Sequence, residues 1–454
     1  MKRLSNIRLP IDDRLRDGEI IFDSRIVSVS TGKLDISVSE EIDGNGMIAL
    51  PGGIDPHVHF NTPGFTHHET FETGSRGAIK GGITTIIDMP CTSLPPVTDS
   101  DSLRNKLNAV SHSAWCDFGF HGGISGNVFD SGEDLFKKLT SLKESGVTAI
   151  KVYTVSGMDT FRDLDNHQIF RTMKICARLD LPVMVHAEDK STVNNLTAAL
   201  KAEGRIDYRA YCDSRPVEAE LIAVNNVCFM AYLTGAKTHI VHMSSGEGVK
   251  VVRSWKEKGA NVTCETCPHY LEFSDEDFAE FKGILKTAPV VKGKNVRLEL
   301  WEHLASGNIH FMSTDHAPCD PITEKNTGNA WDDYGGIPGV EILYPYMLSE
   351  GLMKKKINLK RLLDIMCRNS ARLFGLYGRK GDILPGFDAD IILFDTESEF
   401  QVNSRDFESV GKYSPFDNMT FRGSIASVFL RGERIYYKGE LSKRCGKYLK
   451  RNPI

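Results

Sequence analysis

Four histidines and one aspartate stand where short apolar segments of the sequence end. The first segment closes with His57 and His59, and three later ones close with His186, His242 and Asp315. Side chains at positions i and i+2 of a β-strand point to the same side, so the first two imidazoles can converge on one point. Each residue alone would also fit a packing or surface role. As a set, imidazole and carboxylate groups suit divalent ions such as zinc.

A lysine lies inside another apolar segment. Lys151 is flanked by Ile150 and Val152, and burying an unpaired ammonium is costly. Burial lowers the pKa of a lysine, and its neutral amine can then react with carbon dioxide. The resulting carbamate would be a two-oxygen anion able to bridge two cations that neutral histidines leave in mutual repulsion. The alternative is a lysine ion-paired across the mouth of the fold.

The elements that must position these residues alternate between strand-like and helix-like. Eight short apolar runs rich in β-branched residues are typical of buried parallel strands, and helical patterns separate them. This alternation predicts an α/β fold, a (β/α)8 TIM barrel over residues 51–378, with its site at the carboxyl ends of the strands. The runs are 47–59, 83–90, 118–124, 149–155, 183–186, 238–243, 261–267 and 309–313, and the clearest helices are 134–144, 166–179 and 217–234.

The two ends of the chain share a different pattern. Residues 1–50 and 379–454 contain short alternating segments separated by turns, which is typical of antiparallel strands. We therefore expect one small β-sandwich domain, built from both termini, beside the barrel.

Composition excludes several classes of protein. The 454 residues are 41% hydrophobic and 25% charged, as in globular proteins. The 55 basic and 60 acidic residues give a net charge of -5, which argues against a nucleic-acid partner. The sequence contains no run of 18 apolar residues, so no membrane span is predicted. No apolar stretch follows the basic N-terminus, so a secretory signal is not expected. The ten cysteines lack a framework spacing, so we expect reduced thiols and a cytoplasmic location.

Three further features could indicate other kinds of site, but each gives only weak support. Cys264 and Cys267 form a CxxC with no second pair to complete a zinc site and no thioredoxin-like context. The glycine-rich segment 335–339 lacks a phosphate-binding fingerprint and is expected to line a pocket. His67 and His68 are expected to be solvated loop histidines.

Over nearly its whole length the chain resembles the cyclic amidohydrolases of the amidohydrolase superfamily, a group of allantoinases, dihydroorotases and hydantoinases or dihydropyrimidinases. The motifs that carry the resemblance include 51–59, 81–85, 314–318 and 384–390. The resemblance implies two divalent ions, usually zinc, and N6-carboxylysine at position 151 as a bridge between them. By the same resemblance, His57, His59 and Asp315 bind the more buried ion, His186 and His242 bind the second, and Asp315 is the catalytic proton acceptor and donor.

Within this group the substrate positions favour the allantoinases, which open allantoin to allantoate. Dihydroorotases of this type have an arginine and an asparagine where this chain has Asn61 and Cys91, so both anchors for a substrate carboxylate are missing. Hydantoinases are expected to have a tyrosine at Ser156. Allantoinase-like motifs occur at 161–163, 214–216, 263–270, 315–319 and 412–416, whereas Thr92 and His68 depart from that pattern.

The resemblance also implies a small-molecule cyclic amide as the ligand and a homo-oligomer, a tetramer or dimer. Dihydroorotate is the first alternative substrate, followed by hydantoins and dihydropyrimidines. A non-catalytic scaffold, as in relatives that have lost metal ligands, is the alternative of a different class, and all six ligand positions are filled here. The residues expected to contact substrate are Asn61, Thr92, Ser156, Thr287, Cys319 and Gly336.

Overall fold

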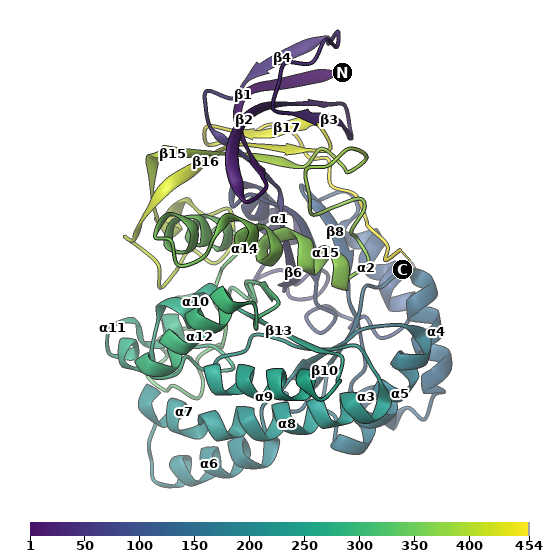
Figure 1. Cartoon of the computed structure of the whole chain (residues 1–454). Coiled ribbons are helices and arrows are strands. Elements are labelled where there is room, and N and C mark those ends of the chain that lie inside the picture. Colours follow the sequence, from purple (N-terminus) through teal and green to yellow (C-terminus); the bar gives the residue numbers. More distant parts are fainter. Residues whose placement is uncertain (453–454) are drawn as a thin grey trace.

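The computed structural model describes residues 1–452, and its central element is the predicted parallel barrel (Figure 1). Neighbouring strands pair in parallel in chain order, and Val58 closes the ring through a parallel bridge to His316. The barrel strands are β6 (Gly53–Val58), β7 (Ile83–Asp88), β8 (Asp117–Phe120) with its continuation β9 (Gly122–Gly123), β10 (Ile150–Tyr153), β11 (Val183–His186), β12 (Thr238–Ile240), β13 (Val262–Thr266) and β14 (Phe311–Met312).

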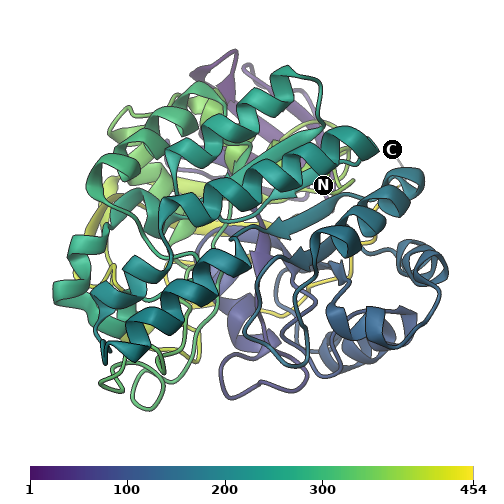
Figure 2. The same cartoon turned by 90° about the horizontal axis from the view of Figure 1, so that it is seen from below.

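Helices cover the outside of the barrel (Figure 2). The predicted helices 166–179 and 217–234 coincide with α5 and α8. Asp165 caps α5 through the backbone N–H of Gln168, and Gly235 ends α8 in the left-handed conformation that glycine tolerates. No helix within residues 1–452 is both long and apolar enough to cross a bilayer. The helices are α1 (Phe71–Lys80), α2 (Ser100–Val110), α3 (Gly126–Asp130), α4 (Leu135–Ser145), α5 (Asn166–Leu179), α6 (Lys190–Ala202), α7 (Tyr208–Ser214), α8 (Val217–Thr234), α9 (Gly246–Glu257), α10 (Pro268–Glu272), α11 (Phe278–Phe281), α12 (Lys294–Ser306), α13 (Leu343–Tyr346), α14 (Leu359–Leu363) and α15 (Asn369–Leu373), with single turns at η1 (Asp275–Asp277), η2 (Lys282–Leu285) and η5 (Ser404–Asp406) and π-helical turns at η3 (Met347–Met353) and η4 (Asp364–Arg368).

Both ends of the chain contribute to a separate sheet, which lies above the barrel in Figure 1. The strands of the expected sandwich are hydrogen-bonded into one nine-stranded sheet, in which β5 from the N-terminal segment pairs with β15 from the C-terminal segment. Its core includes Leu4, Phe22, Ile391 and Phe429. The strands are β1 (Lys2–Ile11), β2 (Arg14–Phe22), β3 (Ile26–Ser30), β4 (Glu40–Asp43), β5 (Ile48–Pro51), β15 (Ile391–Gln401), β16 (Thr420–Leu430), β17 (Glu433–Tyr437) and β18 (Glu440–Leu441).

The two sheets meet at Gly52. The apolar run 47–59 looks continuous in sequence, but the structure divides it into β5 of the terminal sheet and β6 of the barrel. A Cβ atom at Gly52 would lie 2.2 Å from Thr84 Oγ1, so only glycine fits this crossing. The backbone N–H of Gly52 donates to the carbonyl of Asp390, which ties the crossing to the C-terminal segment.

The C-terminal tail leaves the terminal sheet and lies against the barrel. The sequence pattern predicts all of 379–454 in the terminal domain, but the backbone N–H of Phe118 donates to the carbonyl of Lys447, and its carbonyl accepts from the N–H of Leu449 at 2.7 Å. The tail thereby pairs with an edge of β8. Its position follows from the need to satisfy backbone groups at a strand edge, which side-chain patterns do not reveal.

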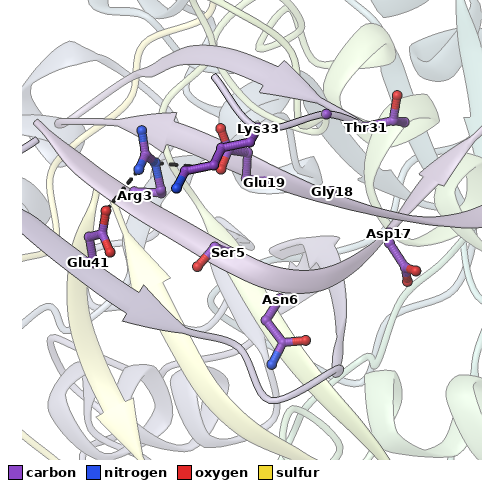
Figure 3. Close-up of a pocket in the computed structure, with 10 residues that line it drawn as sticks. Arg3, Ser5, Asn6, Asp17, Gly18, Glu19, Thr31, Lys33 and Glu41 are labelled. Carbon is purple, nitrogen blue, oxygen red and sulfur yellow. Dashed lines mark hydrogen bonds and ion pairs between the residues drawn. The ribbon is translucent and has the colours of Figure 1, made fainter. Parts of the chain in front are cut away.

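A polar groove of about 320 Å³ lies in the terminal sheet (Figure 3). Arg3 crosses it, pairing with Glu41 at 2.8 Å and with Glu19 at 3.5 Å. The same guanidinium donates to the carbonyls of Leu34 and Ile36. These contacts fasten the 31–39 segment to the sheet, and none of the candidate metal-binding residues lines this groove.

Candidate metal centre and active site

Two strand ends bring three possible ligand atoms together. His57 and His59, at the end of β6, place their Nε2 atoms 3.1 and 3.2 Å from the same oxygen, Oδ1 of Asp315, which follows β14. Ligands bound at about 2.1 Å to one tetrahedral ion lie roughly 3.4 Å apart. The three residues therefore have the spacing of ligands around a single ion.

A second pair of nitrogens faces this group. His186 Nδ1, at the end of β11, lies 3.0 Å from His242 Nε2, just after β12. The ring centroids of His57 and His242 are 5.5 Å apart, so the two groups adjoin. Burial lowers the pKa of both His186 and His242, and for His242 the nearby His186 lowers it further. Two neutral imidazole nitrogens this close together suit a second ion.

The Lys151 amine is buried beside these histidines. Its Nζ has no hydrogen-bond partner within residues 1–452, and it lies 4.9 Å from the ring centroid of Tyr153. Burial lowers its pKa to about 8. An orphaned amine in this position is costly unless it is modified or neutralised. It therefore fits a bridging carbamate better than an ion pair across the barrel mouth.

Carboxylates behind the histidines fix their orientation. Glu265 on β13 accepts from His57 Nδ1 at 2.5 Å and from His239 Nε2 at 3.2 Å. Burial alone would raise the pKa of Glu265, but His57 and His239 outweigh it and hold that pKa well below its usual range. Such partners set the tautomer and the ring angle of metal-binding histidines.

In the second pair, His186 is likewise oriented by a buried carboxylate. His186 Nε2 lies 3.0 Å from Glu188, which also pairs with Arg215. Burial would raise the pKa of Glu188, but Arg215 and His186 outweigh this effect and lower it to about 2. The permanent anion leaves Nδ1 of His186 free to face His242.

Three residues near these strand ends have a strained backbone. Asn61, His242 and Asp315 have φ values of 49°, 37° and 51°, in the left-handed region that side chains disfavour. Such strain persists only where the surroundings enforce it. Asp55 provides part of that enforcement, since it accepts from the backbone N–H groups of His57 and Thr314, each at 3.2 Å.

The six residues expected on the substrate side differ in what their polar groups do. Asn61 Nδ2 and Thr287 Oγ1 are buried and lack a hydrogen-bond partner in the described part of the chain. Thr92 Oγ1 lies 3.1 Å from His59 Nδ1, so it supports a candidate ligand. Cys319 Sγ lies 3.5 Å from the Tyr413 hydroxyl.

The other two expected substrate contacts have engaged polar groups. Ser156 Oγ donates to the Phe161 carbonyl at 2.8 Å. Gly336 donates its N–H to Lys286, and its carbonyl accepts from Lys325 at 2.7 Å and from Tyr413 at 2.9 Å. Both backbone polar groups of Gly336 are therefore hydrogen-bonded, and a Cβ there would meet the Ala317 carbonyl at 2.2 Å.

His269 is a candidate that sequence analysis missed. It lies in α10, directly after β13, at the carboxyl end of the barrel. Its Nε2 is buried without a partner among residues 1–452, and burial lowers its pKa to about 4. A buried neutral imidazole with a free nitrogen is available to a ligand. The signal was its place at a strand end, whereas Glu265 was detectable as a charged residue inside an apolar strand, like Lys151.

Comparison with known proteins identifies the family. The model of the Amidohydrolase family matches residues 48–435. The chain belongs to the amidohydrolase family. It is 36% identical to an allantoinase of Rubrobacter xylanophilus over 94% of this chain and 92% of that one. It is 34% identical to an allantoinase of Escherichia coli strain SMS-3-5 over 93% and 94% of the two chains.

Solved structures show the same architecture for this amidohydrolase. The L-hydantoinase of Arthrobacter aurescens superposes with a TM-score of 0.94 at 29% identity, covering 99% of each chain. The dihydropyrimidinase of Brevibacillus agri NCHU1002 gives a TM-score of 0.91 at 28% identity, over 99% of this chain and 98% of that one. The barrel with its β-rich terminal domain is thus the fold of the family, and the chain is a hydrolase of that family.

Proposed function

We propose that this amidohydrolase opens a cyclic amide at a binuclear metal centre and that its substrate is allantoin. The observation that carries the proposal is the meeting of His57, His59 and Asp315 with the His186–His242 pair beside the orphaned amine of Lys151. Relatives named allantoinase, 33–36% identical over more than nine-tenths of the chain, support the substrate. The filled ligand set argues against a scaffold role.

In this proposal the chain holds two ions, zinc in the first instance, with separate sets of side chains. His57, His59 and Asp315 would hold one, His186 and His242 the other, and carboxylated Lys151 would join them. When bound, such a pair supplies Lewis acidity that polarises a carbonyl and makes hydroxide available near neutral pH.

Asp315 is the residue of this chain that we propose moves the proton. One of its oxygens, Oδ1, already faces His57 and His59. Its carboxylate would take a proton from the attacking water and return it to the ring nitrogen that leaves. The strained backbone at Asp315 is consistent with a carboxylate held in one orientation for that transfer.

Three buried polar atoms without partners among residues 1–452 favour an uncharged, amide-rich ligand. Asn61 Nδ2, Thr287 Oγ1 and His269 Nε2 are buried without partners in the described residues. A ureide ring with its arm offers several N–H and C=O groups to match them. Asn61 carries no charge to pair with a carboxylate, so dihydroorotate is the weaker alternative.

Turnover of three substrates by one metal-loaded preparation tests the assignment. The chain is loaded with zinc under bicarbonate and supplied with allantoin, dihydroorotate or dihydrouracil, with Asp315→Asn as the inactive control. We expect clear preference for allantoin. Preference for dihydroorotate would overturn the assignment of allantoin as the substrate. Absence of bound metal after reconstitution, together with no activity on any ring, would favour the scaffold alternative.

The cytoplasmic location and the homo-oligomer, a dimer or tetramer, stay predictions of the family resemblance. Light scattering coupled to gel filtration measures the oligomeric state directly, and the mass of a monomer would contradict the predicted homo-oligomer.

A further inference from the structure

A second group of candidate ligands lies outside the proposed binuclear centre. His67, His68 and Glu324 each offer one ligand atom, and these atoms lie within 4.8 Å of one another. Two of the residues come from the loop between β6 and α1, and the third comes from the long loop after β14. None of them belongs to the set that faces Lys151.

The structure corrects the expectation of two solvated histidines. The His68 side chain is only 12% exposed, and its Nε2 lies 2.8 Å from Glu324 Oε1. Its ring centroid is 4.1 Å from that of His67 and 4.8 Å from that of Tyr334. Only His67 is exposed.

Glu324 is held in place by its own loop. Its Oε2 accepts from the backbone N–H of Asp320 at 2.9 Å, and its carbonyl accepts from Tyr334 at 2.7 Å. The neighbouring Lys325 points away from the cluster, since its amine donates to the carbonyls of Gly336 and Lys286. Two of the three ligands are therefore already positioned, and only the exposed His67 has to be ordered.

The cluster adjoins the mouth of the active site. Glu69, the residue after His68, lies 3.1 Å from His316, which follows Asp315. Tyr334, which packs on His68, lies two residues before Gly336. The loop that carries His67 and His68 also carries Asn61, and the loop that carries Glu324 also carries Asp315, so the cluster spans two loops that contribute to the candidate site.

We propose that His67, His68 and Glu324 form a third metal site, for Zn²⁺ or a similar ion, at the mouth of the pocket. Two imidazoles and one carboxylate are a common ligand set for zinc, with a remaining position for water. The ion would replace the direct contact between His68 and Glu324 and join the two loops.

Zinc binding to the fully loaded protein tests the site without relying on activity. Equilibrium dialysis of the holoenzyme against rising zinc should show one further ion per chain in the native protein. His67→Ala and Glu324→Gln should remove that ion and leave the other zinc content unchanged. His112→Ala, a change at an exposed histidine elsewhere, is the matched control and should retain it.

The same measurement in a Lys151→Ala background separates this inference from the proposed function, on which it does not depend. With the bridging residue gone, the mouth ion should persist and should still be lost on adding Glu324→Gln. Circular dichroism confirms that each variant folds. A native protein that binds no additional ion at millimolar zinc, or an additional ion unaffected by both His67→Ala and Glu324→Gln, would overturn the third site.

Discussion

His57 and His239 share one buried carboxylate: Glu265 Oε1 lies 2.5 Å from His57 Nδ1, and its Oε2 lies 3.2 Å from His239 Nε2. The bond to Nδ1 leaves Nε2 of His57 facing Asp315. Glu265→Gln should therefore weaken metal retention by about 10- to 100-fold without unfolding the chain. Metal content after dialysis against graded chelator measures this. Glu341→Gln, at another buried carboxylate, should retain its metal, and equal retention by both variants would contradict the role of Glu265.

Substitution of Lys151 should remove the proposed carbamate bridge, which a small anion could replace. Lys151→Ala should lose both ions and activity, because no bridge remains between the two ligand groups. Short carboxylic acids should restore part of the activity by occupying the vacated space. Lys151→Arg is the control, since its guanidinium fills that space and forms no carbamate, so rescue should fail. A fully active Lys151→Ala variant would refute the carbamate.

His269 should matter for substrate rather than for metal. His269→Phe removes the unpartnered Nε2 while keeping a ring of similar size. We expect kcat/KM for the preferred substrate to fall by about 10-fold, the value of one lost hydrogen bond, with metal content unchanged. His310→Phe, a change at the opposite end of the barrel beside the start of β14, should leave kcat/KM within about twofold. Unchanged kinetics in His269→Phe would exclude it from the pocket.

Lys380 joins the terminal sheet to the barrel through buried carboxylates. Its amine lies 2.6 Å from Asp117 at the start of β8 and 2.6 Å from Asp390 before β15. Asp117 also pairs with Arg431, but Lys380→Met leaves the buried Asp390 without a cationic partner and should lower the free energy of unfolding by about 3–5 kcal/mol. The exposed pair of Lys360 and Asp364, 2.8 Å apart, provides the control, and Lys360→Met should change stability by less than about 1 kcal/mol. Equal urea midpoints for the two variants would argue against the role of Lys380.

Glu341 predicts how stability depends on pH. Burial raises the pKa of this carboxyl from 4.5 to about 7. Between these values the folded chain holds a proton that the unfolded chain has released, so this contribution to stability is complete below about pH 4.5 and is lost as pH rises through about 7.

Glu341→Gln should abolish that loss. Between about pH 5 and pH 8, the native chain should lose about 1–3 kcal/mol more of its unfolding free energy than the variant does. Urea titrations followed by tryptophan fluorescence at both pH values measure the difference. Parallel pH profiles would show that the carboxyl ionises without cost in the folded chain.

Much of the fold was predictable because its signals are local. The apolar runs with β-branched residues gave the barrel strands, and α5 and α8 coincide with the predicted helices 166–179 and 217–234. The candidate ligands were predictable as polar residues at strand ends, since a barrel fixes where those ends lie. The break at Gly52 and the path of the C-terminal tail depend on backbone contacts between distant segments, which leave no periodic pattern.

The sequence by itself determined which residue types stand at the strand ends and that Lys151 interrupts an apolar strand. Only the tertiary structure decided that Glu265 is hydrogen-bonded to two histidines and that the polar groups of Ser156 and Gly336 are hydrogen-bonded. It also decided that His68 contacts Glu324, 256 residues away. The physical reason is that hydrogen bonding and burial depend on which surfaces meet in space. The order of residues in the chain specifies the helices and strands, but not directly which side chains of distant segments come into contact.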